Sequence, residues 1–211
     1  MAQEKYTCPL CQSQSIPFHS EHFRKCSGCQ SVFRSKKYFI TREKEQARYE
    51  KHNNDITDKK YQDFMSPIVD MVIKNQQLCE KWLDFWAGTG PVVTYMLEQK
   101  WFHLKLYDPF FHNYPALLKQ KYDFIIATEV VEHFYNPLKE FELLYNLLNQ
   151  GWKLYIMTNL YSPEIDFWKW YYKNDITHVF FYSEDAFKYI KNHWGWENYL
   201  RHNRCIILEK K

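Results

Sequence analysis

Two pairs of cysteines have the spacing of metal-binding turns. Cys8 and Cys11 form one C-x-x-C pair, Cys26 and Cys29 form another, and 14 residues separate the two pairs. Each pair can present two thiolates on one tight turn, so two such turns complete a tetrahedral cage of four sulfurs for Zn²⁺. Gly28 lies inside the second pair, where we expect it to supply a positive φ angle. The spacing predicts a structural zinc site, and two unrelated buried pairs are the alternative.

A glycine-containing turn at residues 86–90 follows an apolar segment and precedes a helix-like segment that begins near Pro91. Glycines after the first strand of a parallel sheet let a ligand approach the backbone, and Asp108, at the end of the next apolar segment, can accept both hydroxyls of a ribose. A dinucleotide would need a third glycine and free N–H donors at the helix start, but that glycine is absent and Pro91 removes a donor. S-adenosylmethionine has no phosphate and needs an acid near its ammonium group and another at its ribose. Asp84 and Asp108 can supply these acids, which favours the methyl donor.

Two glutamates and two histidines form a third group with possible chemistry. Glu129 and Glu132 are three residues apart and His133 follows directly, so on a helical turn these side chains share a face; His178 comes later in the chain. The four side chains could bind a divalent ion, or a candidate catalytic residue among His133, His178 and Glu129 could act on an acceptor group. A purely structural role is the third interpretation, and the residues alone leave all three open.

Strand-like and helix-like segments alternate from residue 81 onwards. We expect strands at 81–85, 102–107, 122–128, 152–159, 196–202 and 205–209, and helices at 92–99, 137–149 and 184–193. Ser183 should cap the last helix, and Gly151 should end the helix before it. The alternation predicts an α/β fold with a mostly parallel, Rossmann-like sheet, an antiparallel C-terminal edge and helices on both faces.

The N-terminal part of the chain differs from this alternating body. Residues 5–39 suggest short strands around zinc, and residues 41–53 and 58–76 suggest amphipathic helices with breaks at 53–54 and near Pro67. We therefore divide the chain into a zinc ribbon at 1–40, a helical connector or cover at 41–78 and a cofactor-binding domain at 79–211. The connector offers four candidates for closing over the cofactor: Arg48, Tyr49, His52 and Asn53. Cys79 and Cys205 stand alone in apolar surroundings, which indicates core positions.

The body resembles the class I S-adenosylmethionine-dependent methyltransferases. The resemblance covers about residues 41–211 and rests on the order and spacing of residues 83–90, 107–111, 122–134, 136–137 and 151–158, with the run E-V-V-E-H-F from Glu129 as its strongest part. It implies that Asp108 holds the ribose and that Pro109 and Phe110 lie beside the adenine. It also implies that the methionine part faces three residues of the turn, Ala87, Gly88 and Gly90, and that Thr128 and Glu129 lie under the sulfonium.

Two details of the resemblance concern the chemistry. The first glycine of the family's turn falls on Trp86, a position where some nucleic-acid methyltransferases similarly carry an aromatic residue. The E-x-x-E-H arrangement is similar to that of small-RNA 2′-O-methyltransferases and of some ubiquinone-pathway O-methyltransferases, which implies a possible second divalent site at Glu129, Glu132, His133 and His178.

Composition and charge limit the remaining choices. The chain has 211 residues and a net charge of +3, and its 45% apolar and 25% charged residues exclude a disordered or collagen-like chain. Its 19% aromatic residues suggest an aromatic-lined pocket or surface. Residues 1–60 hold 12 Lys/Arg and 7 Asp/Glu, a mildly basic segment. An aromatic group before His178 suggests a lid, a platform for a flat acceptor or ordinary packing: Tyr161, Phe167, Trp168, Trp170, Tyr171 and Tyr172. The start lacks a signal-peptide pattern and no stretch approaches about 18 apolar residues, so we expect a soluble, cytoplasmic protein without disulfides.

The sequence thus predicts an enzyme that transfers a methyl group from S-adenosylmethionine to a small-molecule acceptor. One alternative is an RNA methyltransferase that uses the zinc ribbon as a binding handle. Its candidate basic face comprises His19, His22, Arg24, Lys25, Arg34, Lys36 and Lys37. Another alternative is a non-catalytic, zinc-dependent binding protein on a degenerate methyltransferase fold.

Overall fold

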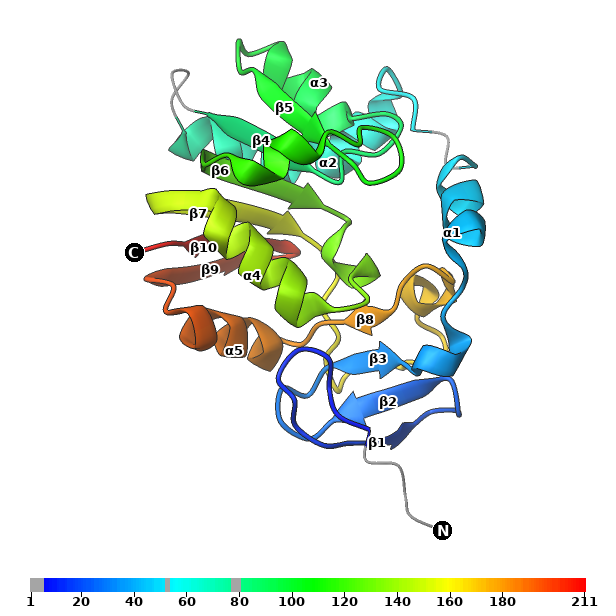
Figure 1. Ribbon diagram of the computed structural model, residues 1–211. Helices are drawn as coiled ribbons and strands as arrows, with labels where there is room; N and C mark the ends of the chain where they lie inside the picture. Colours follow the sequence, from blue (N-terminus) through cyan, green and yellow to red (C-terminus); the bar gives the residue numbers. More distant parts are fainter. Residues whose placement is uncertain (1–5, 52–53, 77–80) are drawn as a thin grey trace.

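The structure, a computed structural model, describes residues 6–51, 54–76 and 81–211 and contains two β-sheets (Figure 1). The strands are β1 (Ser15–Phe18), β2 (Phe23–Cys26), β3 (Val32–Arg34), β4 (Trp82–Phe85), β5 (Leu104–Tyr107), β6 (Tyr122–Thr128), β7 (Leu148–Met157), β8 (Phe180–Phe181), β9 (Asn198–His202) and β10 (Cys205–Glu209). The α-helices are α1 (Arg42–Tyr49), α2 (Lys59–Asn75), α3 (Val92–Glu98), α4 (Pro137–Leu147) and α5 (Glu184–Trp194). Short 3₁₀ helices are η1 (Lys36–Tyr38), η2 (Pro115–Lys119), η3 (Val131–His133) and η4 (Tyr171–Asn174).

The larger sheet has six strands in the order β5-β4-β6-β7-β10-β9. Strands β5, β4, β6 and β7 pair in parallel, whereas β10 runs antiparallel to both β7 and β9. This confirms the predicted α/β fold with a mostly parallel sheet and an antiparallel C-terminal edge. The parallel strands all end at the same edge, so the segments that follow β4, β5 and β6 come together there.

Helices cover both faces of this sheet because the buried strands are apolar on both sides. In β6, Phe124 and Ile126 belong to a core shared with α2 and α3, whereas Ile125 and Ala127 belong to a second core shared with α4 and α5. Ser183 accepts a hydrogen bond from the Ala186 N–H and caps α5, as predicted.

The smaller sheet has the order β1-β2-β3-β8 and crosses the predicted domain boundary. Strand β3 pairs with β8, a two-residue strand shortly after His178. We did not predict this strand from the sequence. The side chains of Phe23, Val32 and Phe181 form a core together with the aromatic residues Tyr161, Phe167 and Tyr172. Most of the aromatic group before His178 therefore packs the N-terminal sheet onto the body, although Trp168 and Tyr171 are exposed.

Two expectations about helix ends were wrong. Pro67 lies inside α2 instead of interrupting it, and the Ser66 hydroxyl donates to the Asp63 carbonyl (3.0 Å), which the proline nitrogen cannot do. Helix α4 ends at Leu147, and Gly151, with a φ of 78°, lies within β7. The chain therefore passes directly from α4 into β7, and Gly151 adopts its left-handed conformation inside the strand, three residues after β7 begins.

The connector crosses the edge of the larger sheet where the parallel strands end, with α1 alongside the sheet in Figure 1. His52, Asn53 and Cys79, as well as the predicted domain boundary at 78–79, lie outside the described residues. Cys205 is buried in the core, as expected. Within the ranges that the structure describes, we find no helix with the length and hydropathy needed to cross a membrane.

Candidate functional site

The turn after β4 is shaped by left-handed backbone at Trp86 (φ 60°) and Gly88 (φ 69°). The N–H groups of Trp86 and Ala87 both donate to the Tyr107 carbonyl (2.7 and 3.1 Å), which ties the turn to the end of β5. Trp86 thus adopts the conformation that glycine would favour at this position. Its indole packs edge-on against Phe134, with ring centroids 5.9 Å apart, and forms one wall of a pocket without filling it.

Gly90 is required for a close approach between the turn and the connector. A Cβ atom at this position would lie 1.9 Å from the Asn54 carbonyl oxygen. The connector therefore packs directly on the glycine turn and covers the pocket.

Asp108 is held at the end of β5 by three backbone donors. Its Oδ1 accepts the N–H groups of Phe110 (2.7 Å) and Phe111 (3.0 Å), and its Oδ2 accepts the N–H of Gly88 (3.0 Å). A carboxylate oxygen has more than one lone pair, so Oδ2 retains accepting capacity towards the pocket. The arrangement fits a carboxylate that accepts ribose hydroxyls.

The pocket at this edge has a volume of about 270 Å³. Five predicted cofactor residues line it: Trp86, Ala87, Asp108, Thr128 and Glu129. So do Tyr49, Asn54, Tyr61, Phe64, Met65, Thr89, Phe111, Val130, His133 and His178. The lining does not include Gly88, Gly90, Pro109 or Phe110. Gly88 and Gly90 act through the backbone of the turn, and Phe111 lines the pocket where the resemblance implied Pro109 and Phe110.

Two buried oxygens in the pocket wall have no hydrogen-bond partner among the described residues: Thr128 Oγ1 and Glu129 Oε1, the latter 4.0 Å from Arg204 Nη1. Unsatisfied buried acceptors are rare in folded proteins unless a ligand or water completes them. Both belong to residues expected under the sulfonium, so the pocket fits the polar methionine end of S-adenosylmethionine.

Asp84 lies beneath the turn and not in the main pocket. Its Oδ2 accepts the Thr94 hydroxyl (2.7 Å), and burial raises the pKa of Asp84 to about 6. It lines a cavity of about 30 Å³ with Gly90 and Pro91, next to the pocket. A role for Asp84 near the ammonium group stays a prediction.

Glu129 and Glu132 meet through Tyr172 and not through a shared helical turn. η3 begins only at Val131, and Glu129 has a φ of 52°, so the expected helical spacing is wrong. The Tyr172 hydroxyl lies 3.3 Å from Glu129 Oε2 and also hydrogen-bonds with Glu132 Oε1.

Burial raises the pKa of Glu129 to about 7 and that of Glu132 to about 8, and the charge of Glu129 raises the Glu132 value further. Because one hydroxyl carries only one proton, it cannot donate to both carboxylates. A proton retained by one of the acids completes the network.

His133 and His178 lie side by side, with ring centroids 4.8 Å apart, and both line the pocket. His133 Nδ1 lies 3.1 Å from the Thr177 carbonyl, and His178 Nδ1 lies 2.7 Å from the Tyr172 carbonyl. A carbonyl can only accept, so each Nδ1 carries the proton and each Nε2 keeps the lone pair in the neutral ring.

The structure brings three of the four predicted divalent-site ligands together. Ligand atoms of Glu132, His133 and His178 lie within 4.8 Å of one another, whereas Glu129 is outside this group. The Glu132 carboxylate also accepts the Thr158 hydroxyl (3.0 Å). The site can therefore act either as a proton acceptor or as a metal-binding group.

The four cysteines also come together. The Sγ atoms of Cys8, Cys11, Cys26 and Cys29, which we call the four-cysteine cluster, all lie within 4.8 Å of one another, and the Cys8–Cys29 distance is 3.8 Å. A tetrahedral Zn–S₄ site has sulfur–sulfur edges of about 3.8 Å.

The expectation for Gly28 was wrong, because its φ is not positive. Gln12 and Gln30, directly after each cysteine pair, adopt φ values of 60° and 58° instead. Gly28 is needed for space, since a Cβ there would lie 2.3 Å from Ser13 Oγ.

The sequence prediction missed most of the pocket's upper wall. Tyr49 was a candidate, but Asn54, Tyr61, Phe64 and Met65 were not. The apolar stripe of α2 was visible, yet a stripe does not show which residues cover a cofactor and which only pack. Arg48 does not line the pocket; it forms an ion pair with Asp175 (2.8 Å) and ties α1 to the segment before His178.

A family model described as "Methyltransferase domain" matches residues 49–200. The chain therefore belongs to this methyltransferase family. It is an S-adenosylmethionine-dependent methyltransferase, as the fold and the cofactor pocket lead us to expect.

Solved structures share the fold at low sequence identity. An O-methyltransferase family protein from Burkholderia thailandensis is 11% identical, with a TM-score of 0.51, 79% of this chain covered and 63% of that chain. The pyocyanin biosynthetic protein PhzM is 7% identical, with a TM-score of 0.51, 72% of this chain covered and 56% of that chain. A SAM-dependent methyltransferase from Thermotoga maritima is 13% identical, with a TM-score of 0.48, 71% of this chain covered and 91% of that chain. The chain spans less than two thirds of the first two proteins, and no curated protein matches it in sequence.

Proposed function

We propose that this enzyme methylates a hydroxyl or amine of a small-molecule acceptor and that the His133–His178 pair accepts the acceptor's proton. In the reaction the bond between the sulfonium and the methyl carbon breaks, a bond from the acceptor atom to that carbon forms, and the released proton moves to an imidazole Nε2. Positioning supplies much of the rate of such an in-line displacement, and a base assists acceptors that are weak acids.

The observation that carries this proposal is the shared pocket. Two imidazoles with their Nδ1 atoms committed to backbone carbonyls line the same 270 Å³ space as Asp108 and Thr128. Either imidazole can then serve as the base near the transferring methyl group, and the other packs beside it.

Two features support a small acceptor over RNA. Side chains of the connector, among them Tyr49, Tyr61 and Phe64, wall in the pocket. The basic residues of the N-terminal sheet are also partly used inside the protein, since Arg34 donates to loop carbonyls and Lys37 pairs with Glu21.

We also propose that the four-cysteine cluster holds one structural Zn²⁺. The support is the convergence of four buried or half-buried thiols with sulfur–sulfur distances suited to a tetrahedral ion. Zinc there would fix the turn before β1 to the turn that joins β2 and β3, and β3 is the strand that pairs with β8.

Glu132, His133 and His178 are a second candidate metal site, because their ligand atoms converge. If a divalent ion binds there, it would orient the acceptor oxygen and lower the pKa of the acceptor hydroxyl. The ion would then take over the role that the imidazole base has in the proposed reaction. The number of bound metal ions per chain separates the two cases. We expect one Zn²⁺ per chain if an imidazole acts as the base, and a second divalent ion if Glu132, His133 and His178 bind metal.

The test measures S-adenosylhomocysteine formation with a panel of hydroxyl and amine compounds and with RNA. We expect turnover with a small acceptor, and loss of at least about 100-fold in kcat for His133→Ala combined with His178→Ala, while S-adenosylmethionine affinity changes little. The matched control is His193→Ala, on the far end of α5. Unchanged kcat in the double variant would refute the role of the pair, and turnover with RNA alone would refute the small acceptor.

A further inference from the structure

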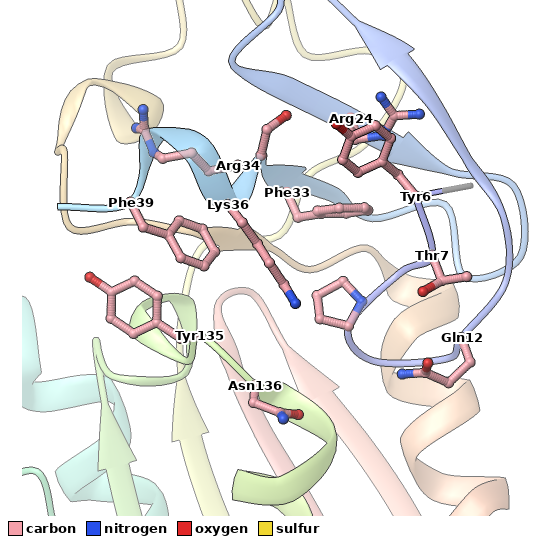
Figure 2. Close-up of a pocket in the computed structure, with 12 residues that line it drawn as sticks. Tyr6, Thr7, Gln12, Arg24, Phe33, Arg34, Lys36, Phe39, Tyr135 and Asn136 are labelled. Atoms are coloured by element: carbon pink, nitrogen blue, oxygen red, sulfur yellow. The ribbon is translucent and has the colours of Figure 1, made fainter. Parts of the chain in front are cut away.

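A second cavity, of about 540 Å³, lies between the N-terminal sheet and the start of α4 (Figure 2). Its lining comes from four separate segments of the chain: Tyr6, Thr7, Pro9, Gln12, Arg24, Phe33, Arg34, Ser35, Lys36, Phe39, Tyr135 and Asn136. None of these residues lines the cofactor pocket. The cavity is therefore distinct from the cofactor pocket.

The lining of this cavity is strongly cationic. It includes Arg24, Arg34 and Lys36 and contains no aspartate or glutamate. Among the described residues, no carboxylate lies within ion-pair distance of any of the three. The charge of Asp175 acts on Arg34 and offsets that guanidinium in part, so Arg24 and Lys36 are the charges left to attract an anion.

Two of the three cations are fixed in the wall. Arg24 donates to the side chain and the carbonyl of Ser15 (2.9 and 2.7 Å), and Arg34 donates to carbonyls of the segment before β8, including that of Asp175 (3.4 Å). These bonds hold the guanidinium groups in place but do not neutralise their charge.

Lys36 differs from the other two cations because its ammonium group has no hydrogen-bond acceptor among the described residues. Figure 2 shows the Lys36 side chain extending into the hollow, between Phe39 and Asn136. Its neighbour Lys37, in contrast, pairs with Glu21 (3.1 Å) outside the cavity. Lys36 is thus the charged group available to a ligand.

The floor of the cavity is the start of α4. Asn136 caps this 11-residue helix through a hydrogen bond from the Lys139 N–H to its side chain. Pro137, at the first helical position, has no N–H to donate, and Glu140 lies in the first turn. Lys36 is therefore the cation that acts on this part of the cavity.

Aromatic rings form the other walls. Phe39 and Tyr135 meet edge-on with centroids 4.7 Å apart, and Tyr6 and Phe33 line the opposite side. Ring faces and edges favour a flat ligand group.

We propose that this cavity binds a small ligand that combines a flat ring with a phosphate or carboxylate group. Lys36 holds the anionic group, and Phe39 and Tyr135 contact the ring. Tyr135 follows His133 by two residues, so a bound ligand would contact the segment that also supplies one wall of the cofactor pocket.

The test measures binding of phenyl phosphate, benzoate, phenol and inorganic phosphate to the full chain by ligand-observed NMR and calorimetry. We expect phenyl phosphate or benzoate to bind with a Kd of about 1 mM or tighter, and phenol and inorganic phosphate to bind at least about tenfold more weakly. The two anions distinguish a phosphate site from a carboxylate site. Equal binding of phenol would show that charge is not recognised and would overturn the proposal.

The variant Lys36→Met should weaken binding of the preferred anion by about tenfold or more, because it removes a charge-assisted hydrogen bond. Lys37→Met is the matched control and should leave that Kd within about twofold. No anion binding at about 10 mM, or equal effects of the two variants, would refute the site. So would an RNA oligonucleotide that binds far more tightly than either anion and depends on Lys36.

S-adenosylmethionine affinity is measured in the same samples. It should be unchanged in Lys36→Met, because Lys36 does not line the cofactor pocket. A failure of this second site thus leaves the methyl-transfer proposal intact.

Discussion

Replacement of Asp108 by alanine tests the centre of the cofactor site. Its carboxylate organises the turn, by accepting N–H groups from Gly88, Phe110 and Phe111, and also faces the pocket through Oδ2. Alanine therefore removes an acceptor from the ribose and from the loop that surrounds it. The cofactor should bind more weakly, and the fold should persist because the side chain lies at the sheet edge and not in the core.

The size of the effect follows from these hydrogen bonds. A hydrogen bond to a charged group contributes about 1.5–3 kcal/mol, and a stranded polar partner costs about 1–3 kcal/mol. The three N–H donors lie in part-buried turns, where water can partly replace the carboxylate. We therefore expect Asp108→Ala to weaken S-adenosylmethionine binding by about 1–3 kcal/mol, which is roughly 5- to 150-fold in Kd.

Calorimetric titration with S-adenosylmethionine measures this change, with Asp123→Ala as the control. Asp123 is the second residue of β6, at the end of the strand away from the pocket, and accepts the Lys81 N–H (2.7 Å) and the Asn149 amide N–H (2.8 Å). Its replacement should lower the melting temperature but leave the Kd within about twofold. A folded Asp108→Ala variant that binds the cofactor as tightly as the unchanged protein would refute the ribose role.

Three further predictions concern the turn, the buried acid and the metal. Gly90→Ala should lower cofactor affinity by about tenfold, because its Cβ must displace the Asn54 carbonyl, whereas Gly195→Ala should affect only stability; equal Kd values for the two would contradict this. Burial raises the pKa of Glu132 to about 8, so the folded state keeps a proton that the unfolded state loses above about pH 4.5. The free energy of unfolding must therefore decrease as the pH rises from about 4.5 to about 8. Glu132→Gln should therefore gain stability relative to the unchanged protein from about pH 5 to about pH 8, measured by urea unfolding, and Glu142→Gln should not; a constant difference would count against a buried neutral acid. Chelation of zinc from the four-cysteine cluster should lower the melting temperature of the whole chain in one calorimetric transition, because β3 pairs with β8 of the body, and a body that melts unchanged would contradict this coupling.

Much of the candidate cofactor pocket was predictable, since five of the predicted residues line it and its turn depends on local backbone requirements. The turn after residue 85 needs particular φ values, and an acid at the end of the next strand must lie beside it, since the carboxyl ends of parallel strands share one edge. Trp86 is the instructive exception, because a left-handed conformation at a tryptophan cannot be inferred from residue type.

The roles of Glu129 and Pro67 were harder to infer, because each depends on a partner that spacing does not show. Glu129 joins Glu132 through Tyr172, which follows 40 residues after Glu132. The neighbouring Ser66 hydroxyl supplies the donor that Pro67 lacks and lets α2 continue.

The sequence by itself determined the fold class, the cofactor turn and the two cysteine pairs. These features depend on short-range periodicity and on backbone geometry within a few residues. Only the tertiary structure decided that β3 joins β8, that the connector closes the cofactor pocket and that Lys36 faces a second cavity at the start of α4. Such contacts bring together residues far apart in the chain, and their geometry is set by how whole elements pack, which no local pattern encodes.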